Sequence, residues 1–211
     1  MVSSLGIKRD VMRSFFVFIL TVGSSHGAPS FRAPFGTVAL DAWGDGIRLR
    51  VAPGASPIVD PSVMALLPTP PAPSVPTSAS GSSVTVGDLT AASDPHTGLV
   101  VFSRVSTGAV LLNITAFKFG AAARFARPGS VSAAVDFSGL TPGEKVYGLG
   151  EHAGSAVGVT QLSTVNGLEN NGELTIPWFV SSRGYGFLWN VPSYGNLTVG
   201  AAAMEWASDA T

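Results

Sequence analysis

The feature of this sequence that most limits its fold is a succession of short apolar runs, separated by glycine- and proline-containing turns roughly ten residues apart. None of the runs repeats its apolar residues with the period of an amphipathic helix. Short, closely spaced strands of this kind are typical of two packed antiparallel sheets. The pattern therefore predicts an all-β protein, an antiparallel β-sandwich. The expected strands lie within residues 37–43, 47–51, 84–89, 99–105, 109–119, 130–140, 146–152 and 176–200.

The first hairpin is centred on residues 44–46, where two glycines flank an aspartate. The strand that follows, residues 47–51, alternates apolar and basic side chains. Because successive side chains of a strand point to opposite faces, we expect Leu49 in the core and Arg48 and Arg50 on the other face.

Residues 68–83 are rich in proline and serine and interrupt the series of strands. Proline cannot donate a hydrogen bond to a sheet, so we expect a solvated surface loop and not a domain boundary. A proline-rich ligand motif is the alternative reading of the same residues.

The N-terminal residues 1–27 have the composition of a signal peptide, expected as a helix ahead of the sandwich. Basic residues precede the apolar run 14–23, and small residues at Ser25 and Gly27 fit a cleavage site. The run is too short to anchor the chain stably in a bilayer, although a single membrane anchor is the alternative. The mature domain would then be residues 28–211.

Two further features agree with the secretory route. Asn113 and Asn196 each begin an Asn-X-Thr triplet and are predicted glycosylation sites. The chain contains no cysteine, which excludes disulfides and a thiolate zinc site, so the domain must rest on its apolar core. We therefore predict a secreted glycoprotein.

The charge balance limits the choice of partners. The net charge is −1 and only 12% of residues are charged, so no basic stripe marks a nucleic-acid surface. No segment beyond the leader has the length of a membrane span. A neutral ligand such as a sugar is compatible with this composition.

Two motifs stand close together near the C-terminus: "VYGLGEH" at residues 146–152 and "IPWFVSSRGYGFLWN" at residues 176–190. Gly148 and Gly150 are expected to let the chain turn sharply out of a strand. Gly184 and Gly186 are likewise expected to let the second motif turn tightly, with Arg183 and Tyr185 projecting from it. Glu151 either bonds backbone amides of its turn or contacts a ligand.

The second motif is also strongly aromatic. Trp178, Phe179, Phe187 and Trp189 occupy alternating positions on two expected strands, and most of their area is predicted to be core. The functional alternative is a sugar-stacking platform, because an exposed Trp offers an apolar ring face to sugar C–H groups.

The two motifs together resemble the N-terminal sandwich domain of glycoside hydrolase family 31, the family of α-glucosidases and α-xylosidases. The "GDGIRLRV" hairpin, "ALLP" and "VSTGAVLL" follow in the same order, so the resemblance runs from about Phe35 to the end. The ending "GFLWNVPSYG" looks most like the α-xylosidase branch. The resemblance implies a galactose mutarotase-like supersandwich over residues 28–211.

The resemblance also implies what this domain would do. In the family a (β/α)8 barrel follows the sandwich, and a loop of the sandwich reaches over the barrel to help form the sugar pocket. Here that loop is residues 152–174, and Asn170 and Asn171 lie near the expected sugar contact. His152 could bond a sugar hydroxyl. The structural alternative is that Asn170 and Asn171 serve only as turn residues.

No catalytic residue is expected in this chain. The family hydrolyses terminal α-linked glucose or xylose with two aspartates of the barrel, a pair that needs defined separation across the scissile bond. The chain is therefore expected to be an inactive fragment that stops before the barrel. The rival readings are a stand-alone carbohydrate-binding module and a ligand-free structural extracellular domain.

The other acidic and histidine residues form no recognisable site. Asp41 and Asp136 fall in expected strands, and Asp45, Asp88, Asp94 and Glu144 in turns, so they are interpreted as solvated or turn-capping groups. Besides His152, His26 lies in the expected signal peptide and His96 in a turn, so neither a metal site nor another cofactor is predicted.

Overall fold

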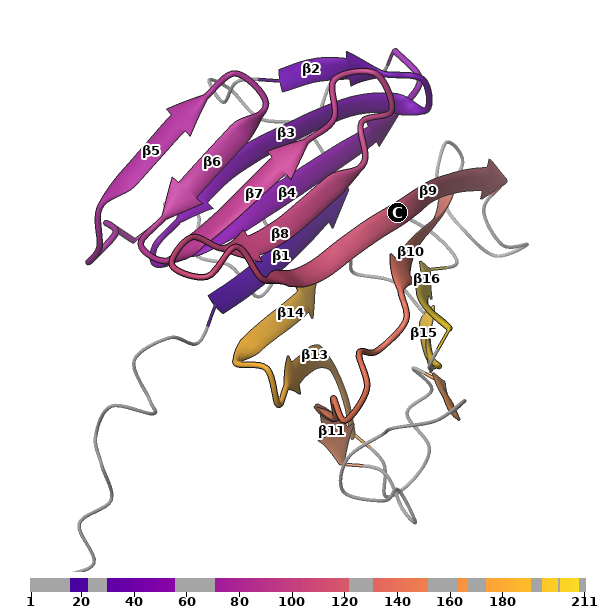
Figure 1. Ribbon diagram of the computed structural model, residues 1–211. Helices are drawn as coiled ribbons and strands as arrows, with labels where there is room; N and C mark the ends of the chain where they lie inside the picture. The colour runs from indigo at the N-terminus through magenta and orange to yellow at the C-terminus, as the bar shows by residue number, and fades with distance from the viewer. Residues whose placement is uncertain are drawn as a thin grey trace, which may run out of the picture.

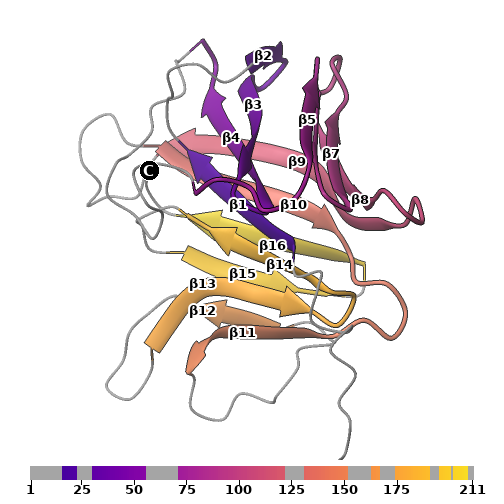
Figure 2. The same cartoon turned by 90° about the vertical axis from the view of Figure 1, so that its left-hand side faces the viewer.

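The structure, a computed structural model, describes residues 16–22, 30–55, 71–121, 131–151, 163–166, 174–190, 195–200 and 202–208. These residues form strands and turns, arranged as two sheets that pack face to face (Figures 1 and 2). The predicted all-β sandwich is confirmed for this part of the chain.

The first sheet has seven strands in the order β11-β13-β14-β1-β4-β3-β2. Its strands are β1 (Phe16–Val22), β2 (Ser30–Ala33), β3 (Gly36–Trp43), β4 (Gly46–Pro53), β11 (Val146–Glu151), β13 (Leu174–Ser181) and β14 (Tyr185–Trp189). The predicted hairpin around residues 44–46 is confirmed as the β3–β4 turn.

The second sheet has nine strands in the order β12-β15-β16-β10-β9-β8-β7-β6-β5. They are β5 (Thr77–Ser80), β6 (Ser83–Val86), β7 (Leu89–Ser93), β8 (Val100–Arg104), β9 (Val110–Ala121), β10 (Val131–Ser138), β12 (Ser163–Asn166), β15 (Gly195–Val199) and β16 (Ala203–Ser208). All pairs within this sheet are antiparallel.

Two boundaries differ from the sequence prediction. The expected surface loop 68–83 contains strand β5, because the four residues after Pro76 lack proline and pair with β6. All four are exposed at the edge of the sheet, a position that tolerates polar residues. The expected single strand 84–89 is divided between β6 and β7 by a two-residue turn at Gly87, whose φ is 56°.

The N-terminal run also differs from its expected form. Part of the predicted signal-peptide helix, Phe16–Val22, is strand β1 in the structure. Its run of apolar residues suits a strand with neighbours on both sides as well as it suits a leader. The rest of residues 1–27 lies outside the described part, and removal of the leader stays a prediction.

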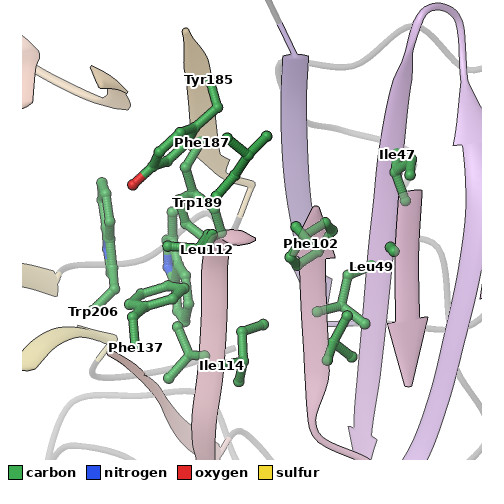
Figure 3. Packing of buried hydrophobic residues seen from close by; sticks show 14 of the residues in the cluster. Ile47, Leu49, Phe102, Leu112, Ile114, Phe137, Tyr185, Phe187, Trp189 and Trp206 are labelled. Atoms are coloured by element: carbon green, nitrogen blue, oxygen red, sulfur yellow. The ribbon is translucent and has the colours of Figure 1, made fainter. Parts of the chain in front are cut away.

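The core lies between the two sheets and is continuous across them. Ile47 and Leu49 of β4 lie near Phe102 of β8, as Figure 3 shows. Phe187 of β14 meets Phe137 of β10 edge to face, with ring centroids 5.1 Å apart. Burial of such side chains contributes about 1.5–3 kcal/mol each, which is how a domain without cysteine is stabilised.

The opposite face of β4 carries an ion cluster. Arg48 and Arg50 both bind Asp41 of β3, with N–O distances of 2.8 Å, and the Arg48 guanidinium lies over the Trp43 ring. The arginines point away from the core as predicted, yet Arg50 is 0% exposed. The sequence had indicated that Asp41 is a solvated or turn-capping group. The structure shows that it is an ion-pair partner instead.

No helix among the described residues is long and apolar enough to span a membrane.

Candidate functional site

The two sequence motifs fold into one unit at the edge of the first sheet. Strand β13 pairs with β11 on one side and with β14 on the other. Glu151, the last residue of β11, is the register partner of Leu174, the first residue of β13. The predicted loop over the sugar pocket thus leaves the sheet and returns to it at adjacent points.

This loop also reaches the second sheet. Strand β12, Ser163–Asn166, lies within it and pairs with β15 at the edge of that sheet. Strands β11 to β15 therefore gather at one end of the molecule, away from β5 to β8 (Figure 2). The predicted sugar contacts His152, Asn170 and Asn171 lie outside the described residues.

The glycines of the first motif supply positive φ as predicted, but at an irregularity within β11 and not at a turn out of the strand. Gly148 and Gly150 have φ values of 120° and 95°, and the β11–β13 register shifts between them. A Cβ at Gly148 would lie 2.6 Å from the Trp178 backbone oxygen, so this position requires both the positive φ and the missing side chain. Leu149 between them also has a positive φ, 70°. The Glu151 side chain is not among those described, and its two predicted roles remain predictions.

Glu144 ties the second motif to the turn before β11. Its carboxylate accepts hydrogen bonds from Ser181 Oγ at 2.5 Å, Tyr185 OH at 2.8 Å and Thr141 Oγ1 at 2.8 Å. The Thr141 backbone N–H donates a fourth, at 3.1 Å. The sequence reading of Glu144 as turn-capping is confirmed, but the residue is buried, 6% exposed, and not solvated.

The electrostatics of this cluster follow from those hydrogen bonds. Burial raises the pKa of Glu144, but the bonds from Ser181, Thr141 and Tyr185 outweigh it, and the pKa falls below its ordinary value. Burial and the neighbouring Glu144 charge raise the pKa of Tyr185, which stays a neutral donor. The cluster is a carboxylate that is ionised at neutral pH and held by donors, which makes it an anchor and not a proton-transfer site.

Arg183 connects the same hairpin to the second sheet. Its guanidinium donates to the carbonyl oxygens of Val110 at 2.6 Å and Leu111 at 3.4 Å, at the start of β9. Arg104 of β8 donates in return to the Arg183 carbonyl at 3.0 Å. The motif "SSRGYG" is therefore a junction between the two sheets.

The remaining glycines of the motif differ in role. Gly184 has a φ of 80° in the turn, as predicted. Gly186 lies within β14, where a Cβ would be 2.3 Å from the Trp178 ring. Its prediction as a turn residue is wrong, because what it provides is room for an indole on the neighbouring strand.

The aromatic side chains are mostly core, as predicted. Phe179, Phe187 and Trp189 are at most 2% exposed and contact Trp206 of β16, whose ring lies 5.8 Å from that of Trp189. Trp178 is half-buried on the opposite face of its strand. A stacking platform made of all four rings is thereby excluded.

Of the other predicted turn carboxylates, Asp94 caps its own turn by accepting from the backbone N–H groups of His96 and Thr97. Asp45 and Asp88 instead accept from Ser74 and Ser106, which belong to other segments. These hydrogen bonds lower the pKa of Asp45 and Asp94 below the ordinary value.

Sequence reasoning missed a charged cavity on the second sheet. Lys118 Nζ binds Asp136 at 2.7 Å and Glu205 at 2.8 Å, and these hydrogen bonds raise the lysine pKa. The three residues line a cavity of about 550 Å³ together with Thr198 and Met204. Strand pairing brings these residues of β9, β10 and β16 side by side. In the sequence, only the alternation of polar and apolar residues in each strand could have indicated this cavity.

The carboxylates of this cavity do not form a glycosidase pair. Such hydrolysis needs one carboxyl as a proton donor and the other as nucleophile or base, whereas Asp136 and Glu205 are both ion-paired to one ammonium group. No group of acidic and histidine side chains in the described ranges has the arrangement of a metal site.

The two predicted glycosylation sites both lie in strands of the second sheet. Asn113 is a half-buried residue of β9 whose register partner is Val101, and Asn196 lies in β15 between β12 and β16. Their modification remains a prediction.

The chain is similar to curated glycosidases over short segments. An α-xylosidase of Saccharolobus solfataricus is 42% identical over 69 residues, covering 28% of this chain and 9% of that protein. α-Xylosidase A of Aspergillus niger is 31% identical over 85 residues, covering 40% of this chain and 11% of that protein. The chain thus spans about a tenth of the length of these relatives.

Solved structures of this kind share the fold. A family 31 α-xylosidase from a soil metagenome, complexed with xylose, matches 86% of this chain and 29% of its own with a TM-score of 0.70 and 21% identity. The family 31 α-xylosidase of Xanthomonas citri matches 83% of this chain and 19% of its own, with a TM-score of 0.62 and 22% identity.

The family resemblance seen in the motifs is confirmed by a match that spans residues 67–197, more than half of the chain. This match includes the turn held by Glu144, all of β11 and the β13–β14 hairpin. The chain belongs to the family of glycosyl hydrolase 31 N-terminal galactose mutarotase-like domains.

Proposed function

We propose that this chain is the substrate-pocket-supporting domain of an α-xylosidase-type glycosidase, whose catalytic barrel is a separate part of the full-length protein. Its role is to hold the loop at residues 152–174 at the mouth of that barrel. The substrate class is a glycan with terminal α-linked xylose, or glucose as the second choice.

One observation carries this proposal: the loop is anchored on a rigid base. Both of its ends belong to the β11–β13 pair, and that pair is fixed by the Glu144 hydrogen bonds and the Arg183 junction. A loop that contributes to a ligand site is useful only when its supports hold it in place. The names of the curated and structural relatives, α-xylosidases, favour xylose as the sugar.

The chemistry is assigned to the catalytic domain. The purified chain should release no sugar from 4-nitrophenyl α-xyloside or α-glucoside, because the acidic groups that line its cavity are ion-paired to Lys118. Measurable hydrolysis by the purified chain would place catalysis in it and would overturn the proposal.

The loop is tested in the protein that carries both this chain and its barrel. Asn170→Ala and Asn171→Ala should raise KM for the α-xyloside about tenfold, as for a lost hydrogen bond of roughly 1.4 kcal/mol, and leave the unfolding temperature unchanged. Asn113→Ala, on β9 of the second sheet, is the matched control in protein made without glycosylation and should change neither. Equal effects of all three substitutions would refute a role of the loop in sugar binding.

The secretory route is a part of the same proposal. The leader-like residues 1–27 and the triplets at Asn113 and Asn196 support it. Expression in a eukaryotic cell should place the protein in the medium, with a mass that falls on glycosidase treatment. An intracellular, unglycosylated product would contradict this part alone.

A second candidate is direct sugar binding by the chain itself, favoured by the cavity at Lys118. Carboxylates and an ammonium group are suitable partners for sugar hydroxyls. Titration of xylo- and gluco-oligosaccharides should then show saturable binding that Lys118→Ala abolishes. Binding that is absent, or indifferent to this substitution, would eliminate the second candidate.

A further inference from the structure

Strand β1 differs from every other described strand in its pairing. It runs parallel to both neighbours, with Phe18 opposite Ile47 of β4 and opposite Phe187 of β14. All other strand pairs in the described residues are antiparallel. In both views of the fold this N-terminal strand lies inside the sheet, between β4 and β14 (Figures 1 and 2).

The fold would lose stability if the place that β1 occupies were left empty. The other strands of the sheet form two groups, β11-β13-β14 and β4-β3-β2, and among the described strands only β1 joins them. The core-facing residues Leu49 of β4 and Phe187 of β14 are buried on the two sides of that place. An empty place would leave a row of backbone N–H and C=O groups without partners beside the core, and each one that is shielded from water destabilises the fold.

Nor can a neighbouring hairpin supply the missing strand. The other edge of β4 is taken by β3 and that of β14 by β13. A strand parallel to both must come from a distant part of the chain or from another molecule, because a tight turn joins only antiparallel strands.

We propose that the place between β4 and β14 is a strand-acceptor site for an extended apolar segment that runs parallel to both. Phe16–Val22 occupies it in the full chain, and a chain that loses this segment binds it again from solution. The recognition is main-chain pairing along two edges, as in other cases of strand addition. It does not depend on the proposed sugar or barrel, but it bears on the secretory route, because removal of residues 1–27 would take Phe16–Val22 out of this place.

Paired cysteines test the occupancy in the full chain, which has no cysteine of its own. Ile19 and Leu188 are register partners, so Ile19→Cys with Leu188→Cys should form a disulfide on mild oxidation. Val17→Cys with Leu188→Cys is the matched control: the same face of β1, but Cα atoms ~8 Å apart, beyond disulfide reach. Equal cross-linking of both pairs, or of neither, would overturn the register and the proposal.

Exchange tests the site itself. A specific protease sequence placed within residues 24–28 allows the folded full chain to be cut after β1. We then add a fluorescent peptide of residues 14–24 with flanking lysines, and follow its anisotropy. The cut protein should take up the peptide and the uncut protein should not.

A peptide with Ile19→Pro is the control for strand pairing, because proline removes a backbone donor in the middle of β1. It should bind at least about tenfold more weakly. Uptake of both peptides alike would show unspecific apolar binding and refute the site. A cut protein that dimerises and excludes the peptide would assign the site to a second copy instead, and would overturn the occupant proposed here.

Discussion

At Glu144 a single carboxylate accepts hydrogen bonds from three side chains, two of which lie about 40 residues further along the chain. Removing the charge leaves the donors of Ser181 and Tyr185 poorly satisfied in a buried setting, which costs about 2–4 kcal/mol. We therefore expect Glu144→Gln to lower the free energy of unfolding by this amount, measured by denaturant titration. Glu205→Gln, at a half-buried carboxylate on the outer face of β16, is the control and should cost less than about 1 kcal/mol.

The same carboxylate makes a prediction about pH. The pKa of Glu144 is lower in the folded chain than its ordinary value of 4.5, so the stability it contributes is present above that value and is lost as pH falls through the folded pKa. The difference between wild type and Glu144→Gln should thus be full at pH 7 and shrink below about pH 4.5. Parallel unfolding curves at pH 3 to 7 measure it, and a difference that stays constant would contradict the assignment.

Two glycines with positive φ allow the stability cost of backbone strain to be measured apart from the cost of a steric clash. Gly148 and Gly143 have φ values of 120° and 81°, but a Cβ at Gly148 meets the Trp178 carbonyl at 2.6 Å, whereas at Gly143 nothing lies within 4 Å. Gly143→Ala should cost about 1 kcal/mol from backbone strain alone, and Gly148→Ala at least about 2 kcal/mol more. Equal losses in thermal unfolding would mean that the β11 bulge relaxes around a side chain.

The role of a single residue could be predicted from the sequence only where that role depends on its neighbours along the chain. The positive φ of Gly148 and Gly150 was predictable because it is a property of a few adjacent residues. Gly186 was misread because its reason, the Trp178 ring, lies on another strand. The burial of Glu144 was missed for the same cause, since its cover comes from a hairpin far along the chain.

At the scale of elements, the Arg183 junction is the feature that makes the hairpin a fixed support. Arg183 bonds two carbonyl groups of β9, and Arg104 of β8 bonds the Arg183 carbonyl. A hairpin released from this junction would open locally while the rest of the sheet holds. Arg183→Ala should therefore increase amide hydrogen exchange of β13 and β14 about tenfold or more, with little change in β6 and β7.

Arg32→Ala is the matched control, since Arg32 donates to a carbonyl, that of Gly54, at the opposite end of the fold. It should leave exchange in β13 and β14 unchanged. Uniform acceleration throughout the domain on Arg183→Ala would show a global loss of stability and not a local junction.

The presence of a strand could be predicted where apolar runs alternate with polar and turn residues, as in the β3–β4 hairpin. Strand β5 was not, because its residues Thr77–Ser80 are all exposed and carry no apolar signal. Strand β1 was assigned to a leader because an apolar run of this length has the same composition in both settings. Loop residues Asn170 and Asn171 stay predictions that rest on the family resemblance.

At the scale of the whole molecule, the two sheets share one aromatic core and should unfold together. Trp206 of β16 contacts Phe179, Phe187 and Trp189 of the first sheet, and it is parallel to Trp189 within 9°. These rings pack in a closed core that water does not enter. Truncation of Trp206 therefore leaves a cavity between the sheets, and the neighbouring rings lose their contacts with it. Trp206→Ala should cost about 3–5 kcal/mol.

Trp43→Ala removes an equal side chain from the opposite face of the first sheet, where its ring lies 4.1 Å below the Arg48 guanidinium. The loss there should be nearer 1 kcal/mol, the size of a partly exposed cation–π contact. Far-UV and near-UV circular dichroism of both variants should each give one coincident thermal transition, because no sheet can keep its core face without the other. A Trp206→Ala protein that loses near-UV signal first, while its strands persist, would show that the sheets are separable and that the aromatic stack only fills space between them.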